Sequence, residues 1–312
     1  MEHPAYREML ALSREAQQQE RTVAYLAEHL GQLLKKREKV FICFFDHQEG
    51  GLGWLMEQAV LRCDGVPVIW GPDHLWKTLL QQAFYSRAST IIAPPLIVLG
   101  LAKLKKYNGI PLYIRRAITA GYPCLDWMID GIVSGLDCTT GGCFGVGQTG
   151  ILAGFSCTKS RGVHLREDAY GVDIVDGSGT PVPDGELGEM VLWPKDRPEL
   201  RLPLGQNARL VTEPCPCGCT APRLMDLCPG RTEDPALAEL GQYLQSWTSV
   251  LDCRLNRGEY GLELEMIVFA GEQLPVLPSA AKQVIRPWDP KLDEPFWYIP
   301  VLTKSENDGK TH

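Results

Sequence analysis

The sequence predicts an α/β protein in which a mainly parallel sheet flanked by helices precedes a small antiparallel β unit and a reduced C-terminal segment. Apolar and amphipathic runs alternate up to about residue 106, which is typical of a parallel sheet with helices on its faces. After Gly150, short alternating segments separated by turns favour antiparallel pairing. Buried strands are predicted at 40–45, 66–70 and 90–93, and helices at 54–63, 76–85 and 96–106.

Three further regions complete the predicted organisation. Residues 8–36 carry apolar side chains at helical spacing, which predicts an amphipathic leading helix. Later strands are predicted at 171–175, 188–192 and 208–211, with a final pair at 246–255 and 262–269. The proline-rich stretch 275–300 has no assignment. We therefore expect a leading helix and parallel α/β subdomain over 1–149, an antiparallel subdomain over 150–231 and a reduced C-terminal segment over 232–312.

Composition excludes several classes of protein. The 312 residues carry a net charge of −7 and form no long basic stripe, so a nucleic-acid partner is not expected. No apolar run approaches the roughly 20 residues that span a bilayer, and no basic and apolar leader is visible, so we expect a cytoplasmic protein without a membrane partner. Three of the eleven cysteines crowd into Cys215–Cys219, which favours metal ligation over disulfides.

The order and spacing of several motifs identify a family resemblance. The run Gly185–Leu192 is followed by Arg209, by the Cys-Pro-Cys-Gly element at 215–218 and by Gly230-Arg231. Upstream stand Ala120-Gly121-Tyr122-Pro123 and Phe144-Gly145-Val146-Gly147-Gln148. Together these motifs resemble those of the adenylate-forming enzymes, and most closely the phenylacetate-CoA ligase-like branch. The similarity runs from about residue 38 to 234, so residues 1–149 would contain the C-terminal part of an adenylate-forming core.

The resemblance implies a nucleotide site and the chemistry of acid activation. Such enzymes join a carboxylic acid to AMP, using ATP and magnesium, and then usually pass the acyl group to coenzyme A. The corresponding nucleotide-binding positions in this sequence are Ala120, Gly121, Tyr122, Phe144, Gly145, Gln148, Gln206 and Arg231. Phe144 would stack on adenine and Arg231 would meet the ribose. AMP or ATP with magnesium, and a small carboxylic acid, are the ligands this resemblance implies.

Several positions depart from the family pattern. No Ser/Thr/Gly-rich phosphate loop with a lysine is recognised before the leading helix. Gln148 stands where the family has the magnesium-binding Glu, with Gly147 in place of the preceding Thr, and Gln206 replaces the ribose-binding Asp. A neutral amide does not supply a carboxylate's charge to a hard cation. We therefore expect vestigial nucleotide binding, assign no catalytic residue and predict that ATP-dependent acid activation has been lost.

One set of residues keeps the branch's pattern in full. Cys157 precedes His164 by seven residues, and in the resembling branch such a pair joins two cysteines of the Cys-x-Cys-Gly element, here Cys215 and Cys217, around zinc. Three thiolates and an imidazole form a closed tetrahedral set, which is typical of structural zinc. Cys219 and Cys228 are alternative ligands, and free cysteines in a tight turn remain the alternative without metal. Glu167 or Asp168 would either orient the imidazole or lie in solvent.

Three functions remain in competition. The leading hypothesis is a binding or accessory protein that keeps the fold and the zinc. The second is an active aryl- or acyl-CoA ligase whose phosphate loop comes from another chain. The third is a zinc-stabilised scaffold that binds no nucleotide and uses its aromatic C-terminal segment on a protein partner. In that segment, Trp288, Phe296 and Trp297 would either cover the surface that the family's mobile domain would have covered, or form a patch for the partner. The oligomeric state is left open.

Overall fold

The computed structural model describes residues 3–45, 47–71, 73–147, 149–156, 162–229, 235–258, 261–277 and 282–296. Its larger sheet begins with five parallel strands: β1 (Lys39–Ile42), β2 (Val66–Ile69), β3 (Thr90–Ala93), β4 (Arg116–Thr119) and β5 (Thr139–Gly145). Their spatial order is β2-β1-β3-β4-β5. The strands predicted at 40–45, 66–70 and 90–93 correspond to β1, β2 and β3, and the last of these predictions has the same bounds as β3.

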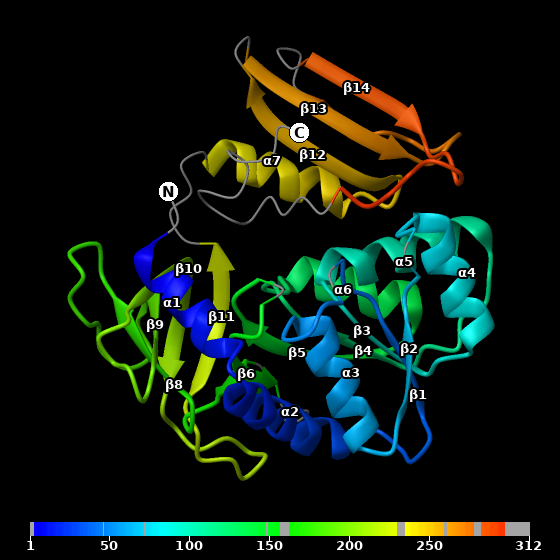
Figure 1. The fold of residues 1–312 in the computed structure, drawn as a ribbon. Helices are drawn as coiled ribbons and strands as arrows, with labels where there is room; N and C mark the ends of the chain where they lie inside the picture. The colour runs from blue at the N-terminus through cyan, green and yellow to red at the C-terminus, as the bar shows by residue number, and fades with distance from the viewer. Residues whose placement is uncertain are drawn as a thin grey trace.

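Helices cover both faces of the parallel strands (Figure 1). One face carries α2 (Ala16–Gly31) and α3 (Leu52–Arg62), and the other carries α4 (Trp76–Ser86), α5 (Pro95–Asn108) and α6 (Asp126–Leu136). Alternate residues of each strand face opposite ways. Val40 and Ile42 therefore join the core beneath α2 and α3, and Phe41 joins the core beneath α4, α5 and α6. The predicted helices at 54–63, 76–85 and 96–106 are confirmed as α3, α4 and α5.

The leading helix is two helices rather than one. Residues Pro4–Ser13 form α1, and the chain turns at Arg14 and Glu15 before α2 begins. Glu15 has extended backbone angles, which interrupts the helix. The two helices pack against different cores. Met9 of α1 packs into the antiparallel core, and Leu26 of α2 packs on the parallel strands.

The antiparallel strands continue the same sheet. They are β6 (Leu152–Ser156), β7 (Val163–Leu165), β8 (Tyr170–Val175), β9 (Leu187–Pro194), β10 (Leu202–Val211) and β11 (Arg223–Pro229). β5 pairs in parallel with β4 and antiparallel with β6, so hydrogen bonding is unbroken through the order β5-β6-β7-β11-β10-β9-β8. The strands predicted at 171–175, 188–192 and 208–211 lie within β8, β9 and β10.

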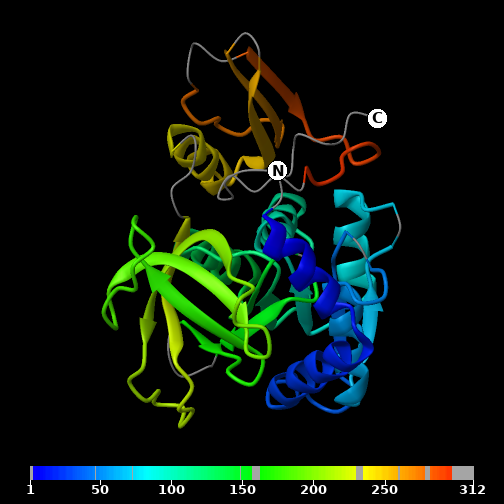
Figure 2. The ribbon, with the colours of Figure 1, turned by 60° about the vertical axis from the view of Figure 1, so that its left-hand side comes forward.

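The end of the described chain forms a separate small sheet, which stands over α4, α5 and α6 in Figures 1 and 2. We call residues 235–258, 261–277 and 282–296 the C-terminal unit. It contains α7 (Pro235–Ser246), β12 (Val250–Gly258), β13 (Gly261–Val268) and β14 (Lys282–Pro287). The predicted strand pair is confirmed as β12 and β13. Neither α7 nor β14 was predicted; β14 is an edge strand with mostly exposed side chains, so it carries no alternating burial pattern.

Across the described residues, no helix combines the length and apolar character that crossing a bilayer requires.

Candidate functional site

The candidate site lies beside the ends of β4 and β5. Ala120 follows β4 directly, is fully buried, and donates its backbone N–H to the Ala93 carbonyl at 3.1 Å. Gly121 has a φ of 91°, a left-handed conformation that favours glycine. The chain thereby turns sharply off the strand and brings Tyr122 to the wall of a cavity. In open α/β sheets the carboxyl edge is where ligands bind.

The end of β5 is shaped by a close backbone approach. A Cβ on Gly145 would lie 2.4 Å from the Ile151 carbonyl oxygen, so only glycine allows β6 to return at this distance. The β5–β6 register shifts between Phe144 and Gly145. Phe144 is almost completely buried, and its ring joins both the antiparallel core and the cavity wall.

These elements enclose a cavity of about 800 Å³, within the range of small-molecule sites. Its walls come from the loop after β4, from α6, from the glycine-rich half of β5, from β11 and from Gln242 of α7. Ser156 Oγ accepts the Gly142 N–H at 2.6 Å, and Thr119 Oγ1 donates to the Gly141 carbonyl at 3.3 Å. The polar groups of the β5 wall are therefore partly engaged within the protein.

Among the described residues, the lining of the cavity carries more acidic than basic side chains. Asp126, Asp130 and Asp226 line it, and Arg209 is the one cation among its described lining residues. Arg209 donates from Nε to Asp226 at 2.9 Å and from Nη1 to the Gly185 carbonyl at 2.8 Å. Its charge is thus already balanced by a carboxylate.

Three cysteines line the same cavity. Burial raises the pKa of Cys124 to about 12 and also raises the pKa values of Cys143 and Cys228. A thiol is nucleophilic as the thiolate. These three side chains are therefore protonated at neutral pH and are not poised for nucleophilic chemistry.

The predicted nucleotide residues divide into four groups. Tyr122 and Phe144 line the cavity, whereas Ala120, Gly121 and Gly145 shape its backbone. Gln206 lies on β10 opposite Pro229 and does not line the cavity. It is buried, and its Oε1 has no hydrogen-bond partner among the described residues. The predicted residues Gln148 and Arg231 lie outside the described part of the chain.

A second candidate site is formed by His164, Cys215 and Cys217. Their possible ligand atoms all lie within 4.8 Å of one another. His164 comes from β7, and both cysteines come from the connection between β10 and β11. That connection turns tightly, with Gly218 at a φ of 90° and its N–H donated to the Cys215 carbonyl at 2.9 Å. Predicted ligand Cys157 lies outside the described residues.

The donor chemistry of this cluster fits zinc. Cys217 Sγ lies 3.3 Å from His164 Nε2, close to the roughly 3.6 Å edge of a tetrahedron with usual zinc–sulfur and zinc–nitrogen lengths. His164 Nδ1 lies 3.2 Å from the Ala221 carbonyl. Donation from Nδ1 to that carbonyl leaves Nε2 free to bind metal. Asp168 instead pairs with Arg166 at 3.3 Å, so the backbone and not this carboxylate orients the imidazole.

Sequence reasoning missed several residues of the first site. Trp127 on α6 and Met225 on β11 line the cavity but belong to no recognised motif. The position of α6, directly after a parallel strand, was a usable signal, because loops and helix starts at this edge meet ligands. Met225 had no such signal, since β11 reaches the cavity only through its pairing with β7 and β10.

Several solved structures have a similar fold. A structure of 2-hydroxyisobutyryl-CoA ligase in the postadenylation state with 2-HIB-AMP is 14% identical, with a TM-score of 0.65 over 91% of this chain and 69% of that one. Another postadenylation complex gives 14% identity and a TM-score of 0.64, covering 85% of this chain and 65% of the ligase. The thioesterfication-state complex with 2-HIB-AMP and CoA is 16% identical, with a TM-score of 0.60 over 79% of this chain and 57% of the ligase.

A mutant of the amide bond synthetase McbA from Marinactinospora thermotolerans is 15% identical, with a TM-score of 0.52 over 81% of this chain and 57% of that one. No family model matches the sequence, and neither does any curated protein. The chain therefore shares the fold of these acyl-CoA ligase and amide bond synthetase structures. It spans roughly two thirds or less of the length of these enzymes.

Proposed function

We propose that this is a phenylacetate-CoA ligase-like protein that binds a nucleotide-sized ligand and has lost ATP-dependent acid activation. It would then act as a binding or accessory protein. The observation that carries the proposal is a cavity of about 800 Å³ bordered by Tyr122 and Phe144, whose one described cation is paired with Asp226. Aromatic side chains suit an adenine ring. A triphosphate instead needs several converging donors and positive charges, which the lining residues that the structure describes do not offer.

Two neutral side chains support the loss of activation. The resemblance assigns Gln148 to the magnesium position and Gln206 to the ribose position. Both are amides where the chemistry requires carboxylates. Removing one such group from a preorganised site costs on the order of 10² to 10³ in rate, so two replacements leave little activation.

Calorimetry with AMP, with ATP and magnesium, and with a panel of aryl and acyl acids tests ligand binding. We expect AMP to bind, and Tyr122→Ala to weaken it about tenfold because a base–aromatic contact is worth roughly 1–3 kcal/mol. Tyr85→Ala, at a 75% exposed position away from the cavity, is the matched control and should have no effect. Absence of heat with every ligand would instead support the nucleotide-free scaffold.

ATP–pyrophosphate exchange tests the loss of activation directly. We expect no exchange above background with any acid. Robust exchange, alone or after addition of a copurifying chain with a phosphate loop, would establish the alternative of an active aryl- or acyl-CoA ligase. If only the double variant Gln148→Glu/Gln206→Asp shows exchange, the two amides are responsible for the loss.

The cysteine and histidine cluster supports a second proposal, that of a structural zinc site. His164, Cys215 and Cys217 would hold the metal together with Cys157. Bound zinc would link β7 to the connection between β10 and β11 and so contribute to the folding free energy. With four protein ligands it would leave no position for substrate.

A further inference from the structure

The contact between the C-terminal unit and the parallel strands is apolar. Leu251, Ile267 and Phe269 belong to the same buried cluster as side chains of α4, α5 and β3. Tyr107 of α5 stacks on Phe269 with ring centroids 4.2 Å apart. Domains that move relative to one another usually meet through polar surfaces, whereas a large apolar interface opposes such motion.

A buried lysine joins α5 to the end of α7. Lys103 is almost fully buried, and its Nζ donates to the Gln245 carbonyl at 2.6 Å and to the Val250 carbonyl at 2.7 Å. Gln245 lies in the last turn of α7, where carbonyls lack helical partners and attract cations. A buried cation also needs such acceptors. Lys103 of α5 therefore satisfies two carbonyls of the C-terminal unit, and these carbonyls in turn satisfy the buried Lys103 ammonium.

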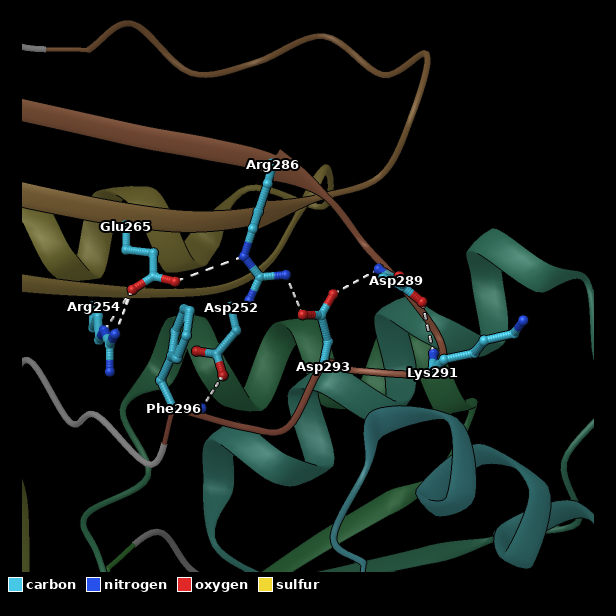
Figure 3. A network of polar contacts seen from close by, with 8 residues as sticks. All are labelled: Asp252, Arg254, Glu265, Arg286, Asp289, Lys291, Asp293 and Phe296. Carbon is cyan, nitrogen blue, oxygen red and sulfur yellow. Dashed lines mark hydrogen bonds and ion pairs between the residues drawn. The ribbon is translucent and has the colours of Figure 1, made fainter.

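The segment from Trp288 to Phe296 makes a complementary contact with α4. The Asp293 carbonyl accepts the N–H of Trp76, the first residue of α4, at 3.0 Å. The Asp293 carboxylate in turn accepts from Arg286 of β14 and from the Asp289 N–H (Figure 3). The start of α4 and the end of α7 are thus both satisfied across the interface.

The same segment is tied to β12. Asp252 Oδ2 accepts the Phe296 N–H at 2.8 Å, and the Arg254 guanidinium lies 4.8 Å from the centroid of the Phe296 ring. Arg254 also pairs with Glu265 of β13, as Figure 3 shows. The segment is consequently held between the three-stranded sheet and the helices beneath it.

We propose that the C-terminal unit is a fixed cap on the helices of the parallel sheet, and that Lys103 is the positioning residue that sets its orientation. One matched ligase has been solved in postadenylation, thioesterfication and open states; in this chain the unit keeps one position. Because Gln242 of α7 lines the large cavity, the cap also fixes one wall of the ligand site. This proposal does not depend on which ligand binds there.

Hydrogen exchange and X-ray scattering on the full chain test the cap. We expect the scattering profile to fit one closed arrangement and to remain unchanged on addition of AMP or coenzyme A. Lys103→Met should speed amide exchange in residues 250–255 and 288–296 at least tenfold. The matched control is Lys105→Met, because Lys105 on the same helix donates to the Gly135 and Leu136 carbonyls of α6 at 3.0 Å each. It should leave both segments protected.

Tyr107→Ala provides a second variant if Lys103→Met does not fold, because it removes the Phe269 contact from a partly exposed position. It should speed exchange in the same two segments. A wild-type scattering profile that requires a mixture of closed and open arrangements, or fast exchange throughout the α5 surface, would overturn the fixed cap. Equal effects of Lys103→Met and Lys105→Met on residues 250–255 would remove the positioning role of Lys103.

Discussion

Among single residues, the turn from Cys215 to Cys219 shows how local geometry selects metal ligands. The Cys215 and Cys217 thiols converge on His164, while Cys219 contributes its backbone N–H, which lies 3.4 Å from Cys217 Sγ. Cys228 lies in the cavity wall. Of the described cysteines, Cys215 and Cys217 are those grouped with the imidazole. The zinc proposal therefore distinguishes between neighbouring cysteines of the same turn.

Cys217→Ser tests that distinction. We expect purified wild-type protein to carry one zinc per chain, and the variant to lose most of it, because a serine hydroxyl is a poor replacement for a thiolate ligand. Unfolding should become easier by about 4 kcal/mol or more, the scale of a lost structural metal. Metal analysis and denaturant unfolding measure both effects.

Cys219→Ser is the matched control from the same turn and should retain the metal. If this variant loses zinc while Cys217→Ser keeps it, the ligand set is wrong. A wild-type protein that binds no zinc after metal-replete purification would remove the site altogether.

Among the elements, α5 is positioned by glycines that let its neighbours approach. A Cβ on Gly100 would lie 2.2 Å from the Trp76 ring of α4. Cβ atoms on Gly131 and Gly135 of α6 would lie 2.7 Å from Leu99 and from Ala102. The helix that carries Lys103 is therefore packed closely against both neighbouring helices.

Gly100→Ala should destabilise the protein by about 1–2 kcal/mol. Alanine favours the helix by about 1 kcal/mol, and overpacking in a core commonly costs about 1–3 kcal/mol. A Cβ only 2.2 Å from the buried Trp76 ring places the overpacking cost in the upper half of that range, at about 2–3 kcal/mol. Gly31→Ala is the control, because its Cβ would meet only Cys63 Sγ at an ordinary 3.8 Å. Denaturant midpoints measure both; equal stability of Gly100→Ala and wild type would contradict the close approach of α4 and α5.

For the whole molecule, the interface beneath the cap contains two buried ionisable groups, the acid Asp252 and the base Lys103. Burial raises the pKa of Asp252 to about 7, although the Phe296 and Cys253 N–H groups and the charges of Lys103 and Arg254 oppose this shift. Burial lowers the pKa of Lys103 to about 8, opposed by Cys253 and Asp252. Both shifts make folding dependent on pH.

The two groups predict least stabilisation between about pH 7 and 8. Between about pH 4 and 7 the folded state holds the Asp252 proton that the unfolded chain loses, so the contribution of Asp252 to stability falls as pH rises. Above about pH 8 the unfolded chain keeps the Lys103 proton that the folded state loses, so stability rises toward pH 10.5.

Unfolding free energies at pH 5, 7.5 and 9.5 test these slopes. Asp252→Asn should abolish the fall between pH 5 and 7.5, and Lys103→Met should abolish the rise above pH 8. Asp130→Asn, at an exposed position, is the control and should follow the wild type. An Asp252→Asn profile parallel to that of wild type would show that Asp252 is ionised in the fold.

The sequence by itself determined the strand and helix order from β1 to α5, because hydrophobic periodicity is a local property. The candidate positions in the cavity wall came from the motifs that carry the family resemblance. It also brought His164, Cys215 and Cys217 together as one candidate set. Only the tertiary structure decided that the leading helix divides at Glu15, that β5 joins the parallel and antiparallel strands, and that Lys103 meets α7. These features depend on contacts between residues as far as 147 positions apart, which no local pattern of side chains encodes.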